Sequence, residues 1–212
     1  MRQFSYTITN ILDDDADFFA NDITDADGTA ATLAATATTD LLAHKVIITP
    51  SGAISGNFTL TGTDADDNAI SETLATDTVN AVTSAKFYKT LTSVIMAAVG
   101  TETIDIGITD DAVSKTILLD PVSPHQAGVM VDTNATTADW TIQETLEKIH
   151  GNSTSPAQLT SWMAITAFTG KTADVASTAT LGSSAIRLLL NSASASTCDI
   201  TIHVSQRSGG AR

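Results

Sequence analysis

Three groups of closely spaced aspartates are the best candidates in this sequence for a metal-binding site. They lie at residues 13–17 (DDDAD), 25–28 (DADG) and 64–68 (DADDN). Such carboxylates could bind calcium, which takes about six to eight oxygen ligands. None of the groups has the glycine-kinked loop of about twelve residues, closed by glutamate, that an EF-hand requires. The pattern therefore favours a solvated acidic loop for the first group and Asx turns for the other two, with calcium binding as the alternative.

The side chains that bind zinc or act as nucleophiles are scattered singly along the chain. The four histidines are His44, His125, His150 and His203, and none belongs to an H-x-H or H-E-x-x-H pair. The single cysteine, Cys198, opens a strand pattern and is expected to be a small buried hydrophobe. The chain has neither a G-x-S-x-G nucleophile elbow nor a glycine-rich phosphate loop. We therefore predict no catalytic residue, no metal site and no cofactor, in a protein that is not an enzyme.

Two tryptophans and one arginine in the second half of the chain could instead contact a ligand or a partner. Trp140 and Trp162 are either exposed platforms for a carbohydrate or anchors in the core or in a subunit contact. Arg187 lies alone in an apolar segment, AIRLLL, where a buried charge without a partner would be costly. We expect Arg187 to face an interface or to pair with an acidic side chain.

Composition limits the classes of protein that remain. The chain has 212 residues, of which 42% are hydrophobic, and a mean hydropathy of +0.13, which is enough for a packed core. No apolar run approaches the roughly 18 residues of a membrane span, and residues 1–10 lack a signal-peptide pattern, so we expect no membrane association. The formal net charge is −14, and residues 1–80 contain 13 acidic and two basic residues. This charge would repel a phosphate backbone, so we expect no direct contact with nucleic acid.

Threonine alternates with apolar residues along much of the chain, which is a period typical of strands. We expect strands at residues 4–8 and 44–49, a hairpin over 57–74, and a long strand within 86–99. Residues 29–39 (TAATLAATATT) fit either a short helix or a loose strand. The expected core residues of the long strand are Phe87, Leu91, Val94 and Ile95. Further strands are expected at residues 103–108, 116–119, 126–131, 140–146, 161–167, 185–190 and 199–206.

This density of short strands, with turn residues between them and few helical patterns, predicts an all-β protein. The expected architecture is two β-sandwich or barrel-like domains with antiparallel strands and little helix. The sequence composition changes between residues 110 and 124, a segment that contains two of the four prolines. We therefore predict an N-terminal acidic β domain over residues 1–112 and a C-terminal β-sandwich-like domain over residues 113–212.

The last strand pattern is strict enough to assign faces. Alternation over residues 199–206 predicts that Ile200, Ile202 and Val204 face inward. The residues between them are then expected to face outward or toward a neighbour: Thr201, His203 and Ser205.

Residues 45–206 contain a series of motifs that resemble a family of virion structural proteins from tailed bacteriophages. In the first half these are IITPSGAISGNFTLTGTDADDNAISE, TVNAVTSAKFYKTLTSV and TIDIGI. In the second half SPHQAGVMV, ADWTIQETLEKI, AIRLLL and TIHVSQ are similar to that family's companion strands. Three positions depart from the family pattern. Asp67 stands where the family usually has glycine, Trp140 stands near its tyrosine, and Glu147-Lys148 replaces a usual aspartate.

The resemblance implies a structural component of the virion, assembled in the cytoplasm of the bacterial host. Within the particle we favour a capsid decoration (cement) protein that binds the major capsid protein and stabilises the head. One alternative is a neck or tail protein, such as an adaptor, tube or fibre-base subunit, and another is a carbohydrate-binding adhesive module. We expect a homo-oligomer whose contacts each bury about 1,000 Å² or more. The acidic first 80 residues are expected to face solvent or a basic partner.

Overall fold

The computed structural model describes residues 2–24, 28–76, 79–96, 101–119, 127–134, 138–147, 161–179, 183–193 and 198–206. Within these residues the chain forms fifteen strands and one short 3-10 helix, η2 (Thr166–Phe168), and no α-helix. The predicted all-β class is therefore confirmed. No helix in this part of the chain is long and apolar enough to cross a membrane.

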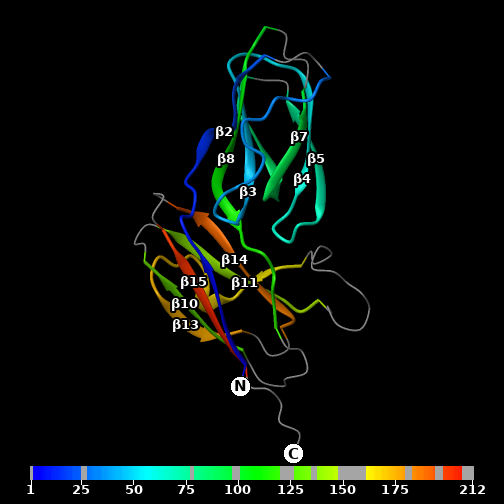
Figure 1. Ribbon diagram of the computed structural model, residues 1–212. Coiled ribbons are helices and arrows are strands. Elements are labelled where there is room, and N and C mark those ends of the chain that lie inside the picture. The colour runs from blue at the N-terminus through cyan, green and yellow to red at the C-terminus, as the bar shows by residue number, and fades with distance from the viewer. Residues whose placement is uncertain are drawn as a thin grey trace, which may run out of the picture. The chain divides into compact units, whose positions relative to one another are not determined.

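The chain divides into two units, and the sequence of one interrupts the sequence of the other. Unit 1 comprises residues 1–12 and 113–212, and unit 2 comprises residues 13–112. The predicted N-terminal domain, 1–112, included the first twelve residues, which the structure places in unit 1. They belong there because their strand pairs with the last strand of the chain, the blue and red strands that lie side by side in Figure 1.

Unit 1 consists of antiparallel strands in two sheets. The strands are β1 (Arg2–Ile8), β9 (Ile117–Leu118), β10 (Gly128–Thr133), β11 (Asp139–Thr145), β12 (Met163–Ala164), β13 (Val175–Thr178), β14 (Ala185–Ser192) and β15 (Ile200–Gln206). One sheet has the order β1-β15-β10-β13, and the other contains β12-β11-β14 with β9 paired to β14. The core is apolar and includes Trp140, Ile142, Phe168, Leu188 and Ile202, all fully buried.

Unit 2 is also built from antiparallel strands. They are β2 (Asp15–Ile23), β3 (Ala43–Pro50), β4 (Gly56–Thr63), β5 (Ala69–Thr76), β6 (Val82–Tyr88), β7 (Thr90–Ile95) and β8 (Ile104–Val113). The order β8-β3-β6, with β2 paired to β8, forms one layer, and β5-β4-β7 forms a second sheet. β2 approaches β8 closely at Gly107, where a Cβ would collide with the carbonyl oxygen of Asp15. Phe19 and Phe58 are fully buried in this unit.

The strand predictions are confirmed where alternation is strict. In β15 the side chains of Ile200, Ile202 and Val204 are buried, and the residues between them are partly exposed. The predicted hairpin over residues 57–74 is the pair β4–β5, which runs in continuous register from Gly56 opposite Thr76 to Thr63 opposite Ala69. A period of two therefore locates strands whose two faces meet different environments.

The long strand expected within residues 86–99 is wrong. The strand is interrupted at Lys89, between β6 and β7, and this interruption changes which side chains face inward. Tyr88 is fully buried instead of Phe87, and Ile95 is 37% exposed. The predictions for Leu91 and Val94 are confirmed because both are fully buried.

Three other segments differ from the expected structure. The acidic loop expected at residues 13–17 runs into β2, where Phe19 supplies the buried anchor. Residues 29–39 form neither a helix nor a continuous strand, and two isolated bridges, from Ala30 and from Ala37, tie them to β7. The strand expected at residues 161–167 shortens to the two residues of β12, followed by η2.

Candidate functional site

The outward surface of the sheet β1-β15-β10-β13 gathers small, polar and apolar side chains on one exposed area. Successive side chains of a strand point to opposite faces, so the residues between the buried ones lie on this surface. They are Gln3, Ser5 and Thr7 in β1, Thr201, His203 and Ser205 in β15, Gly128, Met130 and Asp132 in β10, and Ala176 and Thr178 in β13. This surface is termed the outer face.

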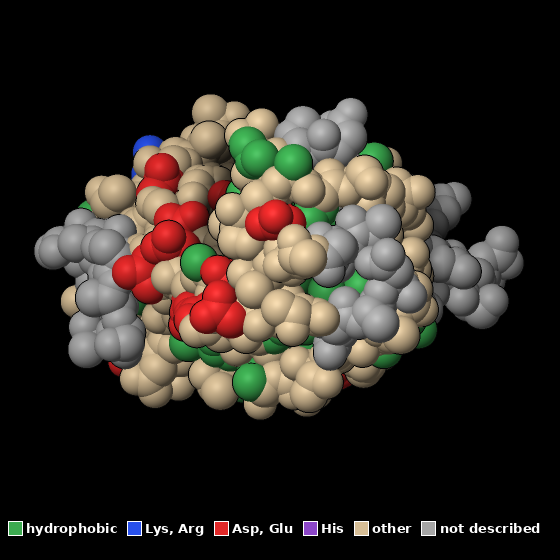
Figure 2. All heavy atoms as spheres, turned by 90° about the horizontal axis from the view of Figure 1, so that it is seen from above, with side chains coloured by type: hydrophobic (Ala, Val, Ile, Leu, Met, Phe, Trp, Pro, Cys, Tyr) green, Lys and Arg blue, Asp and Glu red, His purple; other side chains and the backbone are tan. Residues whose placement is uncertain are grey.

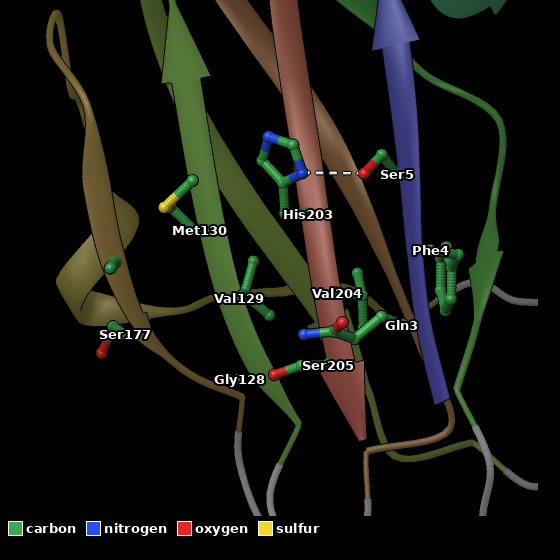
Figure 3. A pocket seen from close by; sticks show the side chains of 11 residues that line it. Gln3, Phe4, Ser5, Gly128, Val129, Met130, Ser177, His203, Val204 and Ser205 are labelled. Carbon is green, nitrogen blue, oxygen red and sulfur yellow. Dashed lines mark hydrogen bonds between the residues drawn. The ribbon is translucent and has the colours of Figure 1, made fainter. Parts of the chain in front are cut away.

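The outer face contains an open hollow of about 460 Å³ (Figure 3). Gly128, Ala176 and Ser205 contribute small side chains to its lining, and a Cβ at Gly128 would lie 2.7 Å from Oγ of Ser205. Met130 and His203 are the larger side chains beside it, and Met130 is 43% exposed. None of the residues that line the hollow is Asp, Glu, Lys or Arg. The hollow can therefore receive an uncharged group without desolvating a charge.

A histidine and a serine meet on this face. Nδ1 of His203 lies 2.7 Å from Oγ of Ser5 (Figure 3). The hydroxyl groups of Thr7 and Thr201 lie 3.1 Å apart. A serine nucleophile activated by histidine also needs a third group that orients the ring. Among the described residues no carboxylate makes a hydrogen bond with His203. Both pairs join residues that stand opposite each other in β1 and β15, so these contacts hold one strand against the other.

Charge is divided very unequally between the two units. Unit 2 contains 17 acidic and 3 basic residues, a net charge of −14, whereas unit 1 contains 7 of each and is formally neutral. Unit 2 therefore accounts for the whole net charge of the chain. Figure 2 shows one face on which acidic side chains gather in a group while Lys and Arg are confined to its margin.

Several carboxylates of unit 2 lie close enough to repel one another. A hydrogen bond from Asp15, followed by burial and the charges of Asp15 and Asp105, raises the pKa of Asp17 above its usual value. Burial, reinforced by the charge of Asp111, raises the pKa of Asp110. Among the described residues no group of three or more His, Cys, Asp or Glu side chains could hold a metal ion. The described carboxylates therefore repel one another but are not arranged as the ligands of one metal ion.

The acidic group at residues 64–68 forms the hairpin turn that was predicted. Oδ1 of Asp64 accepts hydrogen bonds from the backbone N–H groups of Asp66 and Asn68, each at 2.9 Å. Asp67 adopts a left-handed φ of +64°, the conformation that glycine favours, and forms an ion pair of 2.6 Å with Lys89. The Asx-turn prediction is confirmed here, because the carboxylate of Asp64 is engaged by the turn itself.

One buried polar cluster in unit 2 was missed from the sequence. Nε2 of His44 lies 2.9 Å from Oδ2 of Asp40, Nδ1 lies 2.8 Å from the carbonyl oxygen of Thr109, and both the histidine and the aspartate side chains are fully buried. Leu41, which follows Asp40 in the turn before His44, has a left-handed φ of +67° and is 57% exposed. The only sequence signal was an aspartate four residues before a histidine.

The aromatic candidates occupy two different environments. Trp140 is fully buried, with its ring centroid 6.2 Å from that of Phe168, so it is a core residue. Trp162 is partly exposed, and the guanidinium of Arg187 lies 4.3 Å from the centre of its ring. Arg187 also donates a hydrogen bond of 2.8 Å from Nε to the side-chain oxygen of Gln143. An aromatic ring and an amide are thus among the partners of Arg187, and the expectation that it faces an interface or pairs with an acidic side chain stays a prediction.

The remaining candidates are one buried thiol and several residues outside the described part of the chain. Cys198 is buried, as predicted, and burial raises the pKa of its thiol. His125 and His150 lie outside the described residues, as do Asp25 and Asp27 of the acidic group at residues 25–28. Comparison with models of known protein families finds no match for this chain, and comparison with curated protein sequences finds none either.

Proposed function

We propose that this protein is a non-enzymatic structural component of a tailed-phage virion, and within it a capsid decoration (cement) protein that stabilises the head. The observation that carries the proposal is the separation of charge between the units. A unit without net charge can lie against neighbouring subunits without net electrostatic repulsion. A unit with a net charge of −14 keeps the rest of the protein solvated and discourages non-specific association.

The same charge favours one side of a capsid over the other. Packaged DNA presents a dense array of phosphates, and unit 2 has too few basic residues to offset the repulsion. The proposed position is therefore the outer surface of the head, with the major capsid protein as partner and without contact to nucleic acid or membrane. The proposed location is the virion, assembled in the cytoplasm of the bacterial host.

The sequence also suggested two alternatives, of which one is tested below and the other has no support from the tryptophans. A neck or tail subunit would also use neutral strands as ring contacts, and the experiment below separates it from a decoration protein. A carbohydrate-binding module needs an exposed aromatic platform. Trp140 is fully buried and Trp162 is stacked with Arg187, so neither tryptophan supports that alternative.

The first test locates unit 2 in virions that contain this chain. Asp14 is exposed, so Asp14→Cys supplies a thiol for maleimide-gold, while burial keeps Cys198 unreactive. We expect gold on the outside of the head, and no labelling of virions that carry the unsubstituted chain. Gold inside the head or in a DNA-filled channel would overturn both the electrostatic argument and the decoration role.

The copy number per particle tests the decoration role separately. A protein on the capsid lattice is present in a number on the order of hundreds, whereas a neck ring has about six or twelve subunits. Quantitative staining of purified virions, with the major capsid protein as internal standard, distinguishes the two. About six or twelve copies, with gold at the neck, would replace the decoration role by the neck or tail alternative.

A further inference from the structure

We infer that the outer face of unit 1 is a contact between two copies of this chain, in which Met130 of each copy enters the hollow of the other. The inference names a partner for this surface and does not depend on the virion role, because the contact forms between copies in solution. It stands on the charge of the surface, on its shape and on its pattern of polar groups.

Charge selects the region through which two copies can meet. Two copies of unit 2 repel each other, since each has a net charge of −14, and salt screens this repulsion only beyond about 8 Å at physiological ionic strength. Unit 1 is neutral, and the residues that line its hollow include no charged side chain. The single carboxylate on the outer face, Asp132, does not line the hollow. Two outer faces can therefore meet with little electrostatic cost.

Shape supplies the second argument. Met130 is 43% exposed, which is unusual for an apolar side chain in the middle of a sheet face, and it stands opposite Ala176 in the neighbouring strand. The hollow, which Met130 itself helps to line, has a volume of about 460 Å³, and the small residues in its lining are Ser5, Gly128, Ala176, Ser177 and Ser205 (Figure 3). A projection and a recess on the same surface are what a two-fold contact requires, because each patch meets its own copy. Methionine suits this role because its flexible side chain adapts to an irregular recess.

Polar groups around Met130 complete the surface. His203 stands opposite Met130 in β15, Thr201 and Ser205 lie two residues away along that strand, and Ser5 and Thr7 lie beyond it in β1. Of these, Ser5 pairs with His203 and Thr7 pairs with Thr201 within one copy, so few polar groups need a partner from the other copy. An apolar anchor with a polar surround that is already hydrogen-bonded loses little on desolvation.

The test measures the molar mass of the full chain by sedimentation equilibrium and by light scattering. We expect the unsubstituted chain to form a dimer at concentrations above about 1 μM, as a specific interface of ordinary size would give. Met130→Glu introduces a charge that must be buried, and should raise the dissociation constant by about 100-fold or more. Met163→Glu is the matched control, because Met163 is 50% exposed in the same unit but does not lie on the outer face, and should leave the dimer intact.

A second pair of variants tests the recess independently of Met130. Ala176→Glu should weaken self-association, and mixing it with Met130→Lys should restore a dimer that contains one copy of each. Far-UV circular dichroism and tryptophan fluorescence show that each variant is folded. A monomeric unsubstituted chain, dimers of Met130→Glu as tight as the unsubstituted ones, or no mixed dimer would overturn the inference. Incorporation into virions is measured separately, so failure here leaves the gold-labelling result to decide the virion proposal.

Discussion

Units 1 and 2 share an antiparallel β construction but differ in how they treat polar groups. Unit 1 is neutral, has both tryptophans, and packs Trp140 against Phe168 in an apolar core. Unit 2 has a net charge of −14, has no tryptophan, and buries the hydrogen-bonded pair of Asp40 and His44. The difference shows that surface charge is separable from the strand pattern, which depends on the alternation of apolar residues alone.

The placement of the tryptophans makes this comparison measurable. Fluorescence of Trp140 and Trp162 reports on unit 1, whereas far-UV circular dichroism reports on the strands of both units. Unfolding of unit 1 can therefore be followed by tryptophan fluorescence, and unfolding of the whole chain by circular dichroism. Each prediction below changes one unit and uses the other as its reference.

The largest effect is expected in the apolar core of unit 1. Ile202 is fully buried in β15, so Ile202→Asp should lower the free energy of unfolding by about 5 kcal/mol, through loss of packing and burial of a carboxylate. Thr201→Asp, one residue earlier on the outer face, should cost less than about 1 kcal/mol. Denaturant unfolding followed by tryptophan fluorescence measures both. Equal losses would mean that β15 is covered on both faces.

The next effect is expected from the buried pair in unit 2. His44→Ala removes the ring that contacts the fully buried side chain of Asp40 and should cost about 3 kcal/mol, because a buried polar pair is broken from one side. Lys45→Ala removes a partly exposed ion pair with Asp111 and is the control, with an expected loss below about 1 kcal/mol. Circular dichroism should show early unfolding of His44→Ala while the tryptophan transition stays in place. A tryptophan transition that moves equally would show that the units do not unfold separately.

A smaller effect, dependent on pH, is expected from the crowded carboxylates. Because folding raises the pKa of Asp110 above its usual 3.8, the folded chain binds this proton more tightly than the unfolded chain. The stability of unit 2 should therefore fall as the pH rises through the interval above 3.8 and be lower at neutral pH. Asp110→Asn should recover about 0.5 kcal/mol at pH 7, where the partly exposed group is screened by solvent. The gain should vanish below pH 3.8, and a gain that persists there would exclude this cause.

The smallest effect concerns the strained turn beside the buried pair. Leu41 has a φ of +67° and an exposed side chain, so it bears the cost of the left-handed conformation and gains little from burial. Asparagine adopts this conformation readily, and Leu41→Asn should raise the free energy of unfolding by about 0.5 kcal/mol. The melting temperature followed by circular dichroism measures the change. Destabilisation would show that the leucine side chain makes a contact that holds the turn.

Much of the strand layout could be predicted from the sequence, for a physical reason. Strands such as β4, β5 and β15 have one buried and one exposed face, so their side chains alternate in polarity. β2 was missed because its anchor, the buried Phe19, is surrounded by aspartates that look like a loop. The break at Lys89 was missed because both strands that it separates are rich in β-forming residues.

The candidate site was less visible in the sequence because it depends on strands that are far apart in the chain. The outer face combines β1, β10, β13 and β15, and only the faces of β15 could be assigned from alternation. The hollow depends on Gly128 lying opposite Ser205, a register that no local pattern contains. The pair of Asp40 and His44 is close in sequence, but its burial depends on the carbonyl group of Thr109 in β8.

The pairing of β1 with β15 has a consequence for the order in which the chain is completed on the ribosome. Ser5 and its partner His203 are 198 residues apart, so β1 emerges about 10 to 40 seconds before the strand that pairs with it. The pairs β3–β6, β4–β5 and β4–β7 of unit 2 need only residues within 13–112, so they can form during that interval. In the nascent protein, β1 therefore still lacks β15 when the strongly acidic unit 2, which follows it in the chain, has already formed. Repulsion between those acidic units would keep neighbouring nascent chains apart on a polysome until β15 arrives.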